Sequence, residues 1–504
     1  MKRYLIILLL VICPIAFSQP YVYYVAPSGG SDSNTGTNIA APWATLQKAF
    51  STANAGDTVF MRGGSWLPTS RVQHSPPTIG HNGTYANHIV FINYPGEVPI
   101  LDCINFTSTS GNDQGITFTN SDYVELVGLI VQNCLEKVVE QYIAGIDMNY
   151  IGTMWFTRCT SRFIGGHGFQ PNGYDTLYVT DCDVHDCCDS ISATPGNRAD
   201  GFSGGSGGSD VDTFKIAYYV GCRAWNISDD CFEIGTTKQT YHYFCWAFNS
   251  GSNYFVAPLA GGSCFKYNPS NVRLPDKRTM RNCLGVYSGG AGITSVNLND
   301  ELNGPVNRAM NSTFYRTTGL ADGIGDWSYG SYKDSTGKEI YQNILSMETK
   351  LNSSFRFEAY FTAYLGFPYH VTTEAVTWVP KTGALEENSA ATMQNPAYNI
   401  TDADFTKYIS TDSALIIAEL TAPRQSNGKL PYLTYFKLAE SSEAYASGVD
   451  VGMSATPPLG IDWDDVYANY YGEDGESETN NWAIVKSGSV IVKSSDGKII
   501  VIKK

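Results

Sequence analysis

Short stretches of alternating apolar and polar residues, each centred on a cysteine, recur along the middle of the chain. They are separated by 23 or 25 residues, or by 38 to 40 residues where a loop is inserted. Self-similarity at such a period is typical of a solenoid, in which each repeat forms one coil that stacks on its neighbours. We therefore predict that these cysteines lie inside the coils as stacked, free thiols. The six are Cys134, Cys159, Cys182, Cys222, Cys245 and Cys283.

A second apolar position repeats in fixed phase with the first. It falls ten residues after the cysteine in three repeats and twenty residues after it in two others. Each coil therefore holds at least two strands, with insertions tolerated at one turn. Because consecutive parallel coils lie about 4.8 Å apart, equivalent side chains form ladders. The pattern predicts an all-β fold, a parallel β-helix, with ladder positions at Ile146, Phe169, Phe202, Phe232, Phe265 and Ile293.

The N-terminal end of this solenoid carries a different pattern. Between Pro42 and Asn54 the apolar residues follow helical spacing, and Gly56 provides a C-terminal stop. We expect a helix there that caps the open first coil, whose strand is predicted at 57–61. Regular phrases fade after about Arg316. From there to about Trp463 we expect irregular coils and long loops that still pack against the solenoid.

Both termini of the chain look separate from the solenoid. Lys2 and Arg3 precede an apolar run at 4–17, which is shorter than a membrane span and predicts a secretory signal cleaved after Ser18. Residues 466–481 are acidic and polar, and two apolar runs then flank Asp496 and Gly497, a hairpin signal. We expect a signal peptide at 1–18, a β-helix domain at 19–465, and an acidic linker with a short β-hairpin tail at 466–504.

Composition narrows the possible partners. The 33 basic and 48 acidic side chains give a net charge of −15, and no concentrated basic face is visible, so nucleic acid is not an expected partner. Aromatic residues make up 13% of the chain, enough for a core and against intrinsic disorder. We expect a secreted or cell-surface protein with no membrane span, most simply a monomer. Its eleven cysteines after the signal are an odd number, which argues against a disulfide framework.

Acidic residues gather where the second ladder begins. In the predicted register Asp200 stacks on Asp230, Asp229 adds a carboxylate at the turn, and Glu233 lies one coil from Lys266. Converging carboxylates repel one another unless a cation lies between them, and oxygen-only ligands suit calcium. A turn exposed to water would account for any one of these charged residues alone, and a bound calcium could have a purely structural role. The registration of four carboxylates and one lysine across three coils favours a functional site.

At these residues the chain resembles polysaccharide lyase family 9, the calcium-dependent pectate lyases built on a right-handed parallel β-helix. The most specific phrase is C-R-A-W-N-I-S-D-D, from Cys222 to Asp230, followed by Phe265-Lys266. The resemblance covers nearly the whole chain to about residue 465. Further matching phrases lie at 23–32, 62–64, 199–202, 246–249, 402–405, 422–424 and 448–452.

The resemblance implies a function and a set of residues. Asp200, Asp229 and Asp230 match calcium ligands of the family, and Lys266 matches the catalytic base. Glu233, the fourth expected ligand, stands where the family usually has Asp. The run S-G-G-S-G-G after Phe202 replaces a common Lys of the family, which leaves the uronate specificity open. The implied activity is β-elimination in a uronic-acid polymer, most simply pectate. As substrate-binding residues we expect Arg273, Lys277 and Arg278 in the loop after the base.

The chemistry of the residues agrees with this implication. A lysine is a base only when neutral, and its ordinary pKa is about 10.4. Calcium beside Lys266, together with partial desolvation, is expected to lower that pKa, so that activity favours alkaline pH. Two alternatives stay open. Family 28 glycoside hydrolases share the β-helix, but here Gly166-His167-Gly168 precedes Asp229 and Asp230 instead of following them. A non-catalytic surface adhesin or carbohydrate-binding protein would have no special need for Lys266.

Overall fold

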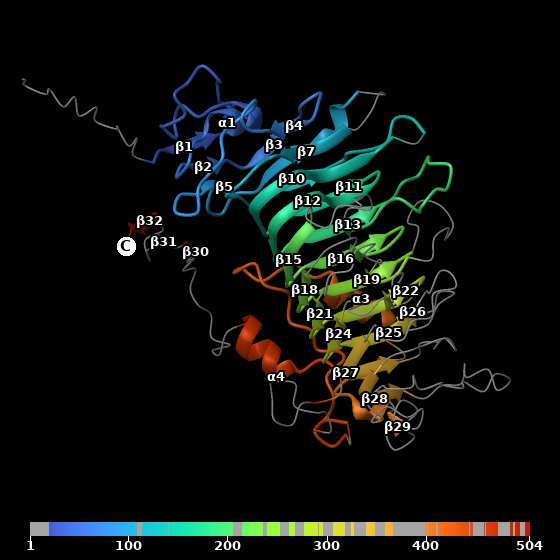
Figure 1. Ribbon diagram of the computed structural model, residues 1–504. Coiled ribbons are helices and arrows are strands. Elements are labelled where there is room, and N and C mark those ends of the chain that lie inside the picture. The colour runs from blue at the N-terminus through green and yellow to red at the C-terminus, as the bar shows by residue number, and fades with distance from the viewer. Residues whose placement is uncertain are drawn as a thin grey trace, which may run out of the picture.

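The computed structural model shows a parallel β-helix, which confirms the predicted fold class (Figure 1). Its strands from β1 to β29 join one continuous, twisted stack. The structure describes residues 20–107, 113–139, 141–204, 214–234, 239–251, 262–267, 277–290, 292–295, 306–317, 324–326, 339–347, 358–365, 399–400, 402–409, 412–442, 444–446, 458, 460–471, 484–486, 489–493 and 499–503.

Most coils contribute one strand to each of three rows, in which strands pair in parallel with the equivalent strand of the next coil. The first row contains β1 (Val22–Val25), β2 (Thr58–Met61), β5 (Ile89–Asn93), β8 (Val124–Val127), the second halves of β10 (Ile143–Thr157) and β12 (His167–Thr180), β15 (Phe214–Val220), β18 (Gln239–Tyr243), β21 (Lys277–Arg281), β24 (Val306–Met310) and the first halves of β27 (Glu339–Met347) and β28 (Glu358–Leu365).

The second row follows the first around each coil. It contains β3 (Gly64–Trp66), β6 (Pro99–Asp102), β9 (Ile130–Gln132), β11 (Thr160–Ile164), β13 (Asp183–Cys187), β16 (Arg223–Ile227), β19 (Trp246–Ser250), β22 (Leu284–Ser288), β25 (Thr313–Thr317), the second halves of β27 and β28, and β29 (Asn399–Ile400). The third row contains β4 (Val72–His74), β7 (Asp113–Thr119), the first halves of β10 and β12, β14 (Phe202–Ser203), β17 (Phe232–Ile234), β20 (Phe265–Tyr267), β23 (Ile293–Ser295) and β26 (Ile324–Asp326).

The predicted capping helix is confirmed as α1 (Leu46–Thr52), with Thr45 accepting a hydrogen bond from the Lys48 amide at 3.0 Å. It begins later than Pro42 because Trp43 pairs with Val25 as an isolated bridge and so keeps this stretch extended. The buried face of α1 covers the first coils. There Phe50 packs 4.5 Å from Phe91, measured between ring centroids.

The predicted cysteine ladder exists, with one correction. All eleven cysteines of the described residues are free and buried, as predicted. Five of the six named cysteines occupy the turn between the first and second rows, each directly after a residue with positive φ. Those five are Cys159, Cys182, Cys222, Cys245 and Cys283.

Cys134 does not belong to this ladder, so that part of the prediction was wrong. It lies at the far end of the second row, level with Ile164 and Cys187. The error has a local cause. Cys134 also follows a residue with positive φ, Asn133 at 60°, because both corners of a coil turn through such a residue and then direct the next side chain inward. The two corners therefore look alike in sequence.

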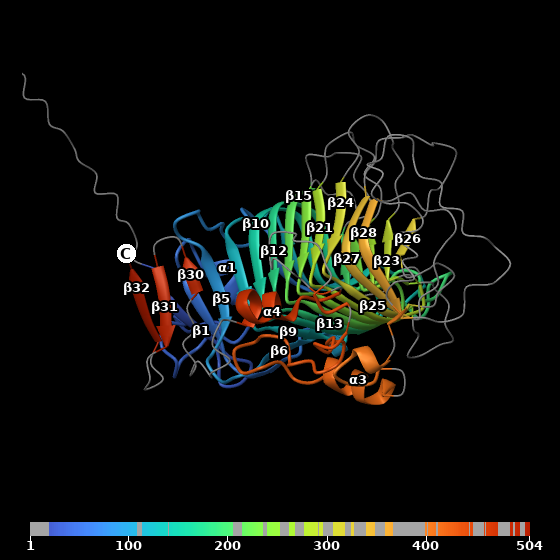
Figure 2. The same cartoon turned by 90° about the horizontal axis from the view of Figure 1, so that it is seen from below.

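The last part of the chain returns along the outside of the solenoid. Strands β25 to β29 continue the coils past residue 316, as expected. The helices α3 (Ser413–Leu420) and α4 (Trp463–Asp465) follow and lie against the side of the solenoid (Figure 2). Ile416, Leu420 and Trp463 join a second apolar cluster with Trp225 and Phe248 of the second row. Two short helical elements also belong to this segment, η2 (Asp402–Asp404) and the π-helical η3 (Val466–Tyr471). A third short helical element, η1 (Cys103–Asn105), lies much earlier in the chain.

Arg424 fixes this returning segment to the coils. Its guanidinium donates to both carboxylate oxygens of Asp183, at 2.6 and 3.0 Å. Arg223 donates to the same carboxylate at 2.8 and 2.9 Å. Although burial raises the pKa of Asp183, the two guanidinium groups more than offset this effect and hold that pKa well below its usual range.

Beyond residue 471 the described residues form a separate antiparallel sheet. The expected hairpin is present, since β31 (Ser489–Lys493) pairs with β32 (Ile499–Lys503), and β30 (Ile484–Lys486) adds a third strand. Packing on the solenoid continues to η3, where the Tyr470 hydroxyl donates to Asp181 at 2.6 Å. The division of the chain at 465 stays a prediction, and the signal at 1–18 lies outside the described residues. Within the described part of the chain, no helix is long and apolar enough to cross a membrane.

Candidate functional site

The third row of strands carries the predicted site in the predicted register. Phe169, Phe202, Phe232, Phe265 and Ile293 pair as successive rungs. Stacking of Phe232 on its neighbours, with ring centroids 4.9 Å apart on both sides, anchors these rungs in the core. Because side chains alternate along a strand, the residue after each anchor faces outward. This places Glu233 directly beside Lys266 of the next coil.

Three of the predicted metal ligands converge at the turn that leads into this row. Asp200, Asp229 and Asp230 each offer a carboxylate oxygen, and these oxygens lie within 4.8 Å of one another. Backbone amides hold two of the carboxylates in place: the Asp230 amide donates to Asp200 at 3.2 Å, and the Ser263 amide donates to Asp230 at 2.5 Å. The ladder itself therefore fixes the positions of these side chains.

The electrostatics of this acidic cluster favour a bound cation. Burial is the largest cause that raises the pKa of each of the three aspartates, and the neighbouring carboxylates add to it. A group of buried oxygens that resist ionising together is the donor set that a hard cation such as calcium prefers. Asp200, Asp229 and Asp230 therefore fit a calcium ion.

Lys266 lies at the edge of the cluster. Its Nζ is 2.8 Å from Asp230 Oδ2 and 3.0 Å from Glu233 Oε1, and its side chain is 27% exposed. Burial lowers the pKa of Lys266, but the surrounding carboxylates, Asp230 foremost, outweigh burial and raise it. The charge of these carboxylates thus controls the protonation of the amine.

Glu233 borders both the aspartate cluster and Lys266, and its carboxylate helps to raise the pKa of Asp200. It lies against Lys266 and accepts a long hydrogen bond of 3.5 Å from Ser203 Oγ, on the preceding rung. Of the four predicted ligands, the structure therefore brings three within 4.8 Å of one another and places the fourth next to both Asp200 and the predicted base.

Of the three predicted substrate-binding residues, the structure describes the backbone of two. Arg273 lies outside the described residues. Lys277 and Arg278 lie on β21, level with Gln239 and Thr240 of the first row, whereas Lys266 lies in the third row. Their side chains also lie outside the described part of the chain, so their role in substrate binding stays a prediction.

His167 is a site residue that the sequence analysis did not single out as functional. Its Nδ1 lies 3.1 Å from Asp200 Oδ2. Burial lowers the pKa of His167 to about 4, although Glu233 and other carboxylates partly oppose the shift. The signal that could have found it was present, because His167 opens the rung directly before that of Asp200.

A polar network continues the third row below His167. Asp147 accepts hydrogen bonds from Asn149 at 2.6 Å and from Asn172 at 3.0 Å, and Gln170 donates to Asn172 at 3.2 Å. Burial raises the pKa of Asp147 to about 6. The outward face of the row is therefore polar over several coils on the N-terminal side of Lys266.

Comparison with known proteins places this chain in a family. The family described as Pel9A-like, right handed beta helix region, matches residues 23–320, which is more than half of the chain. The chain belongs to the Pel9A-like right-handed β-helix family.

Two relatives of known name match different shares of the chain. The chain is 30% identical over 232 residues to pectate lyase PEL9 of Emericella nidulans, a match that covers 44% of this chain and half of that protein. It is 23% identical over 435 residues to pectate lyase L of Dickeya dadantii, a match that covers 86% of this chain and 87% of the relative. These names place the chain among the pectate lyase-like polysaccharide lyases.

Solved structures agree with the Pel9A-like fold. The crystal structure of pectate lyase Pel9A superposes with a TM-score of 0.60 at 18% identity, covering 88% of this chain and 97% of that one. A rhamnogalacturonan lyase superposes with a TM-score of 0.61 at 20% identity, covering 83% of this chain and 97% of that one. At these identities the superpositions establish the common fold.

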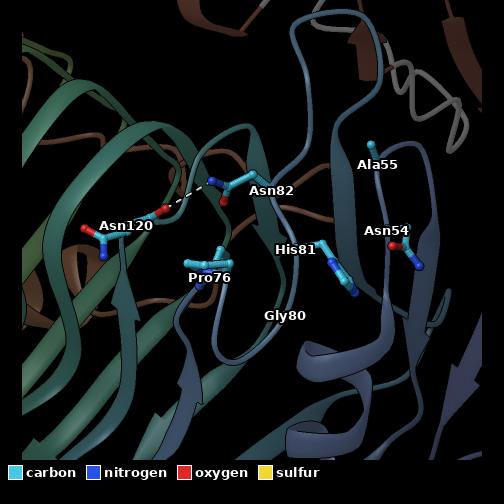
Figure 3. Close-up of a pocket in the computed structure, with 8 residues that line it drawn as sticks. Asn54, Ala55, Pro76, Gly80, His81, Asn82 and Asn120 are labelled. Carbon is cyan, nitrogen blue, oxygen red and sulfur yellow. Dashed lines mark hydrogen bonds between the residues drawn. The ribbon is translucent and has the colours of Figure 1, made fainter.

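A hollow of about 640 Å³ lies away from the acidic cluster, near the N-terminal end of this Pel9A-like solenoid (Figure 3). Asn82, which donates to the backbone of Asn120 at 3.2 Å, lies on its wall. The lining holds no carboxylate and no lysine, so it lacks the groups that the elimination chemistry needs. The remaining lining residues are Asn54, Ala55, Pro76, Pro77, Gly80 and His81.

Proposed function

We propose that this protein is a calcium-dependent pectate lyase that cleaves a uronic-acid polymer by β-elimination, with Lys266 as the base. The observation that carries the proposal is the 2.8 Å contact of Lys266 with Asp230. Asp230 belongs to the aspartate cluster suited to calcium, and Lys266 lies on the next coil. Membership in a family whose named relatives are pectate lyases supports it.

The proposed reaction removes the proton from carbon 5 of a uronate and expels the group on carbon 4. Asp200, Asp229 and Asp230 would hold the calcium, with Glu233 as the fourth carboxylate at its edge. Calcium when bound supplies positive charge that neutralises the substrate carboxylate and the negative charge that develops beside it. Lys266 would take the proton at Nζ, and the electron pair left on carbon 5 would form the double bond to carbon 4 as the bond from carbon 4 to oxygen breaks. The leaving oxygen would keep that bonding pair and take a proton from water.

The surroundings of Lys266 explain how its proton affinity can change. The carboxylates that raise its pKa in this arrangement are the proposed calcium ligands and Glu233. Once their charge is neutralised, burial remains as the cause that lowers the pKa and favours the neutral amine. We therefore expect the activity to rise toward alkaline pH and to require calcium.

The substrate and location complete the proposal. An acidic polysaccharide is the expected partner, bound along the polar outward face of the third row with help from Arg273, Lys277 and Arg278. The signal at 1–18 would deliver the enzyme to the outside of the cell.

A product assay tests the proposal directly. The purified protein would be incubated with polygalacturonate, with a rhamnogalacturonan backbone and with alginate, each in calcium and in chelator. We expect ultraviolet-absorbing unsaturated products from polygalacturonate, in calcium only. New reducing ends without ultraviolet absorption would show a hydrolase instead, and binding without any product would show a carbohydrate-binding protein.

A further inference from the structure

The hollow of about 640 Å³ near the N-terminal end of the solenoid is shaped by backbone. On one side Ser75 and Ile79 exchange two backbone hydrogen bonds, at 2.7 and 2.8 Å, which close the turn that carries Pro76. Gly80 then takes a φ of 90°, and a Cβ at this position would lie 2.5 Å from the carbonyl oxygen of Phe50. The hollow is therefore largely preformed, as small-molecule sites usually are.

Asn82 holds a second wall of the hollow through both ends of its side-chain amide. Its Nδ2 donates to the Asn120 carbonyl at 3.2 Å (Figure 3), and its Oδ1 accepts from the Asp122 amide at 3.0 Å. This wall joins the polar network of the third row, because the Asn120 amide donates to the Asn149 carbonyl at 3.0 Å and Asn149 Nδ2 donates to Asp147 at 2.6 Å. The hollow thus lies at the N-terminal end of the polar face that is proposed to bind substrate.

Among the described residues that line the hollow there is no Asp, Glu, Lys or Arg. The exposed His81 ring extends toward the side formed by Asn54 and Ala55 (Figure 3). Asn54 Nδ2 donates to the Thr52 carbonyl at 3.0 Å, so its Oδ1 is left to accept from a ligand. An imidazole can donate at one nitrogen and accept at the other, as a hydroxyl group requires of its partners. Pro76 and Ala55 add apolar surface beside these polar groups.

This lining decides the class of ligand. A uronate carboxylate would meet no guanidinium or ammonium group there, and a metal ion would meet no carboxylate. A wholly apolar ligand would leave the amide and imidazole groups unpaired. An uncharged sugar fits both kinds of surface, since its hydroxyls donate and accept while its C–H face packs on the proline ring. We infer that the hollow binds an uncharged sugar residue of the polysaccharide, as a site separate from the proposed catalytic centre.

The stacking of the coils separates the two sites. Six steps along the third row, from β4 to β20, lead from the hollow to Lys266, or about 29 Å if consecutive coils are about 4.8 Å apart. A polymer on the polar face can thus be held at the hollow while a distant uronate reaches Lys266. This consequence rests on the proposed function, whereas binding at the hollow requires neither calcium nor Lys266.

Titration calorimetry on the full-length protein in chelator tests the inference. The probes are L-rhamnose and oligosaccharides of galactan and of arabinan, with trigalacturonate as the charged comparison. Ala55→Trp fills the hollow from an exposed turn position, and His81→Ala removes the ring that donates and accepts. Ala40→Trp, at another exposed turn position near the N-terminus, is the matched control.

We expect a neutral probe to bind the wild type, and to bind Ala55→Trp and His81→Ala at least about 5-fold more weakly, the effect of losing one hydrogen bond. Ala40→Trp is expected to bind like the wild type, and trigalacturonate to bind Ala55→Trp as well as it binds the wild type. If Ala55→Trp melts early, His81→Ala decides alone.

Three results would overturn the inference. They are a wild type that binds no neutral probe, equal affinity of the wild type and His81→Ala for these probes, and a loss of trigalacturonate affinity as large as that of the neutral probes. A wild type that binds a neutral probe but forms no unsaturated product from polygalacturonate would refute the proposed function and still support the sugar site.

Discussion

Lys266 Nζ and Asp230 Oδ2 lie 2.8 Å apart on neighbouring coils, although 36 residues separate them in the sequence. The parallel pairing of Phe232 with Phe265 sets this contact, because the two partners lie on the same two coils as that pair. The proposed base is thus held by the register of the solenoid, and its geometry depends little on the loops around it.

Replacing Lys266 by Arg tests its role as base. Arginine keeps the positive charge, but its pKa above about 12 prevents it from acting as a neutral base. We expect turnover on polygalacturonate to fall at least about 10²-fold, the low end for loss of a general base. Polymer binding is expected to survive. Lys407→Arg, a change in a surface ion pair with Glu419, serves as the control. Near-normal elimination by Lys266→Arg would show that Lys266 only provides charge.

Replacing Asp229 by Asn separates calcium binding from folding. Burial and the charges of Asp230 and Asp200 raise the pKa of Asp229, so its ionised form strains the calcium-free protein. In chelator we therefore expect Asp229→Asn to melt at the wild-type temperature or above it. Calcium at a hundred times its Kd is expected to stabilise the wild type by about 2.7 kcal/mol and the variant by much less. A variant that unfolds in chelator would make this carboxylate part of the fold itself.

The eleven buried thiols offer a test of the core. Burial raises the pKa of Cys231, Cys264 and Cys187, among others, which disfavours the reactive thiolate. We expect the native protein to react very slowly with a thiol reagent. After denaturation without reductant, all eleven cysteines that follow the signal are expected to react. Finding most of them already paired as disulfides would contradict the ladder.

His242 predicts how stability changes in acid. It stacks on Tyr219 in the core, and burial lowers its pKa to about 3. Between pH 6.5 and 3 the unfolded chain binds a proton at this residue that the folded protein does not, so stability falls as pH falls. We expect His242→Phe to flatten the dependence of the unfolding free energy on pH by up to about 1.4 kcal/mol per pH unit in this window. Denaturant titrations at pH 7 and pH 5 measure the difference, and an unchanged slope would rule out a neutral buried imidazole.

Removing Arg424 is expected to loosen the returning segment. The Arg424→Ala variant leaves Asp183 with Arg223 as its only guanidinium partner among the described residues. Because Arg223 still pairs with Asp183, we expect the cost to stay below the about 3–5 kcal/mol that follows when a buried charge is left unpaired. Hydrogen exchange is expected to accelerate around α3 and η3 while the coils near β8 stay protected. Uniform acceleration in all strands would show that the segment and the coils open together.

Periodicity made much of this molecule predictable from its sequence. The phase between the cysteine and phenylalanine positions gave the correct rung for Glu233 and Lys266, because a parallel coil repeats its inward positions. The same local rule misplaced Cys134, since both corners of a coil share one conformation and one residue pattern. Contacts between residues that the repeat does not relate could not be predicted in this way. Arg424 and Asp183 are 241 residues apart, and no repeat relates them.

That contact has a consequence for how the protein folds. A solenoid whose coils touch only their neighbours can fray from its ends, with each coil melting almost independently. Arg424, Tyr470 and Arg281 instead tie the end of the chain to coils near its middle. Such a tie closes a very long loop, which slows folding but makes opening of the middle coils depend on release of the C-terminal segment. The acidic turn at Asp229 and Asp230 lies within the tied coils, so its geometry is protected by cooperativity as well as by pairing.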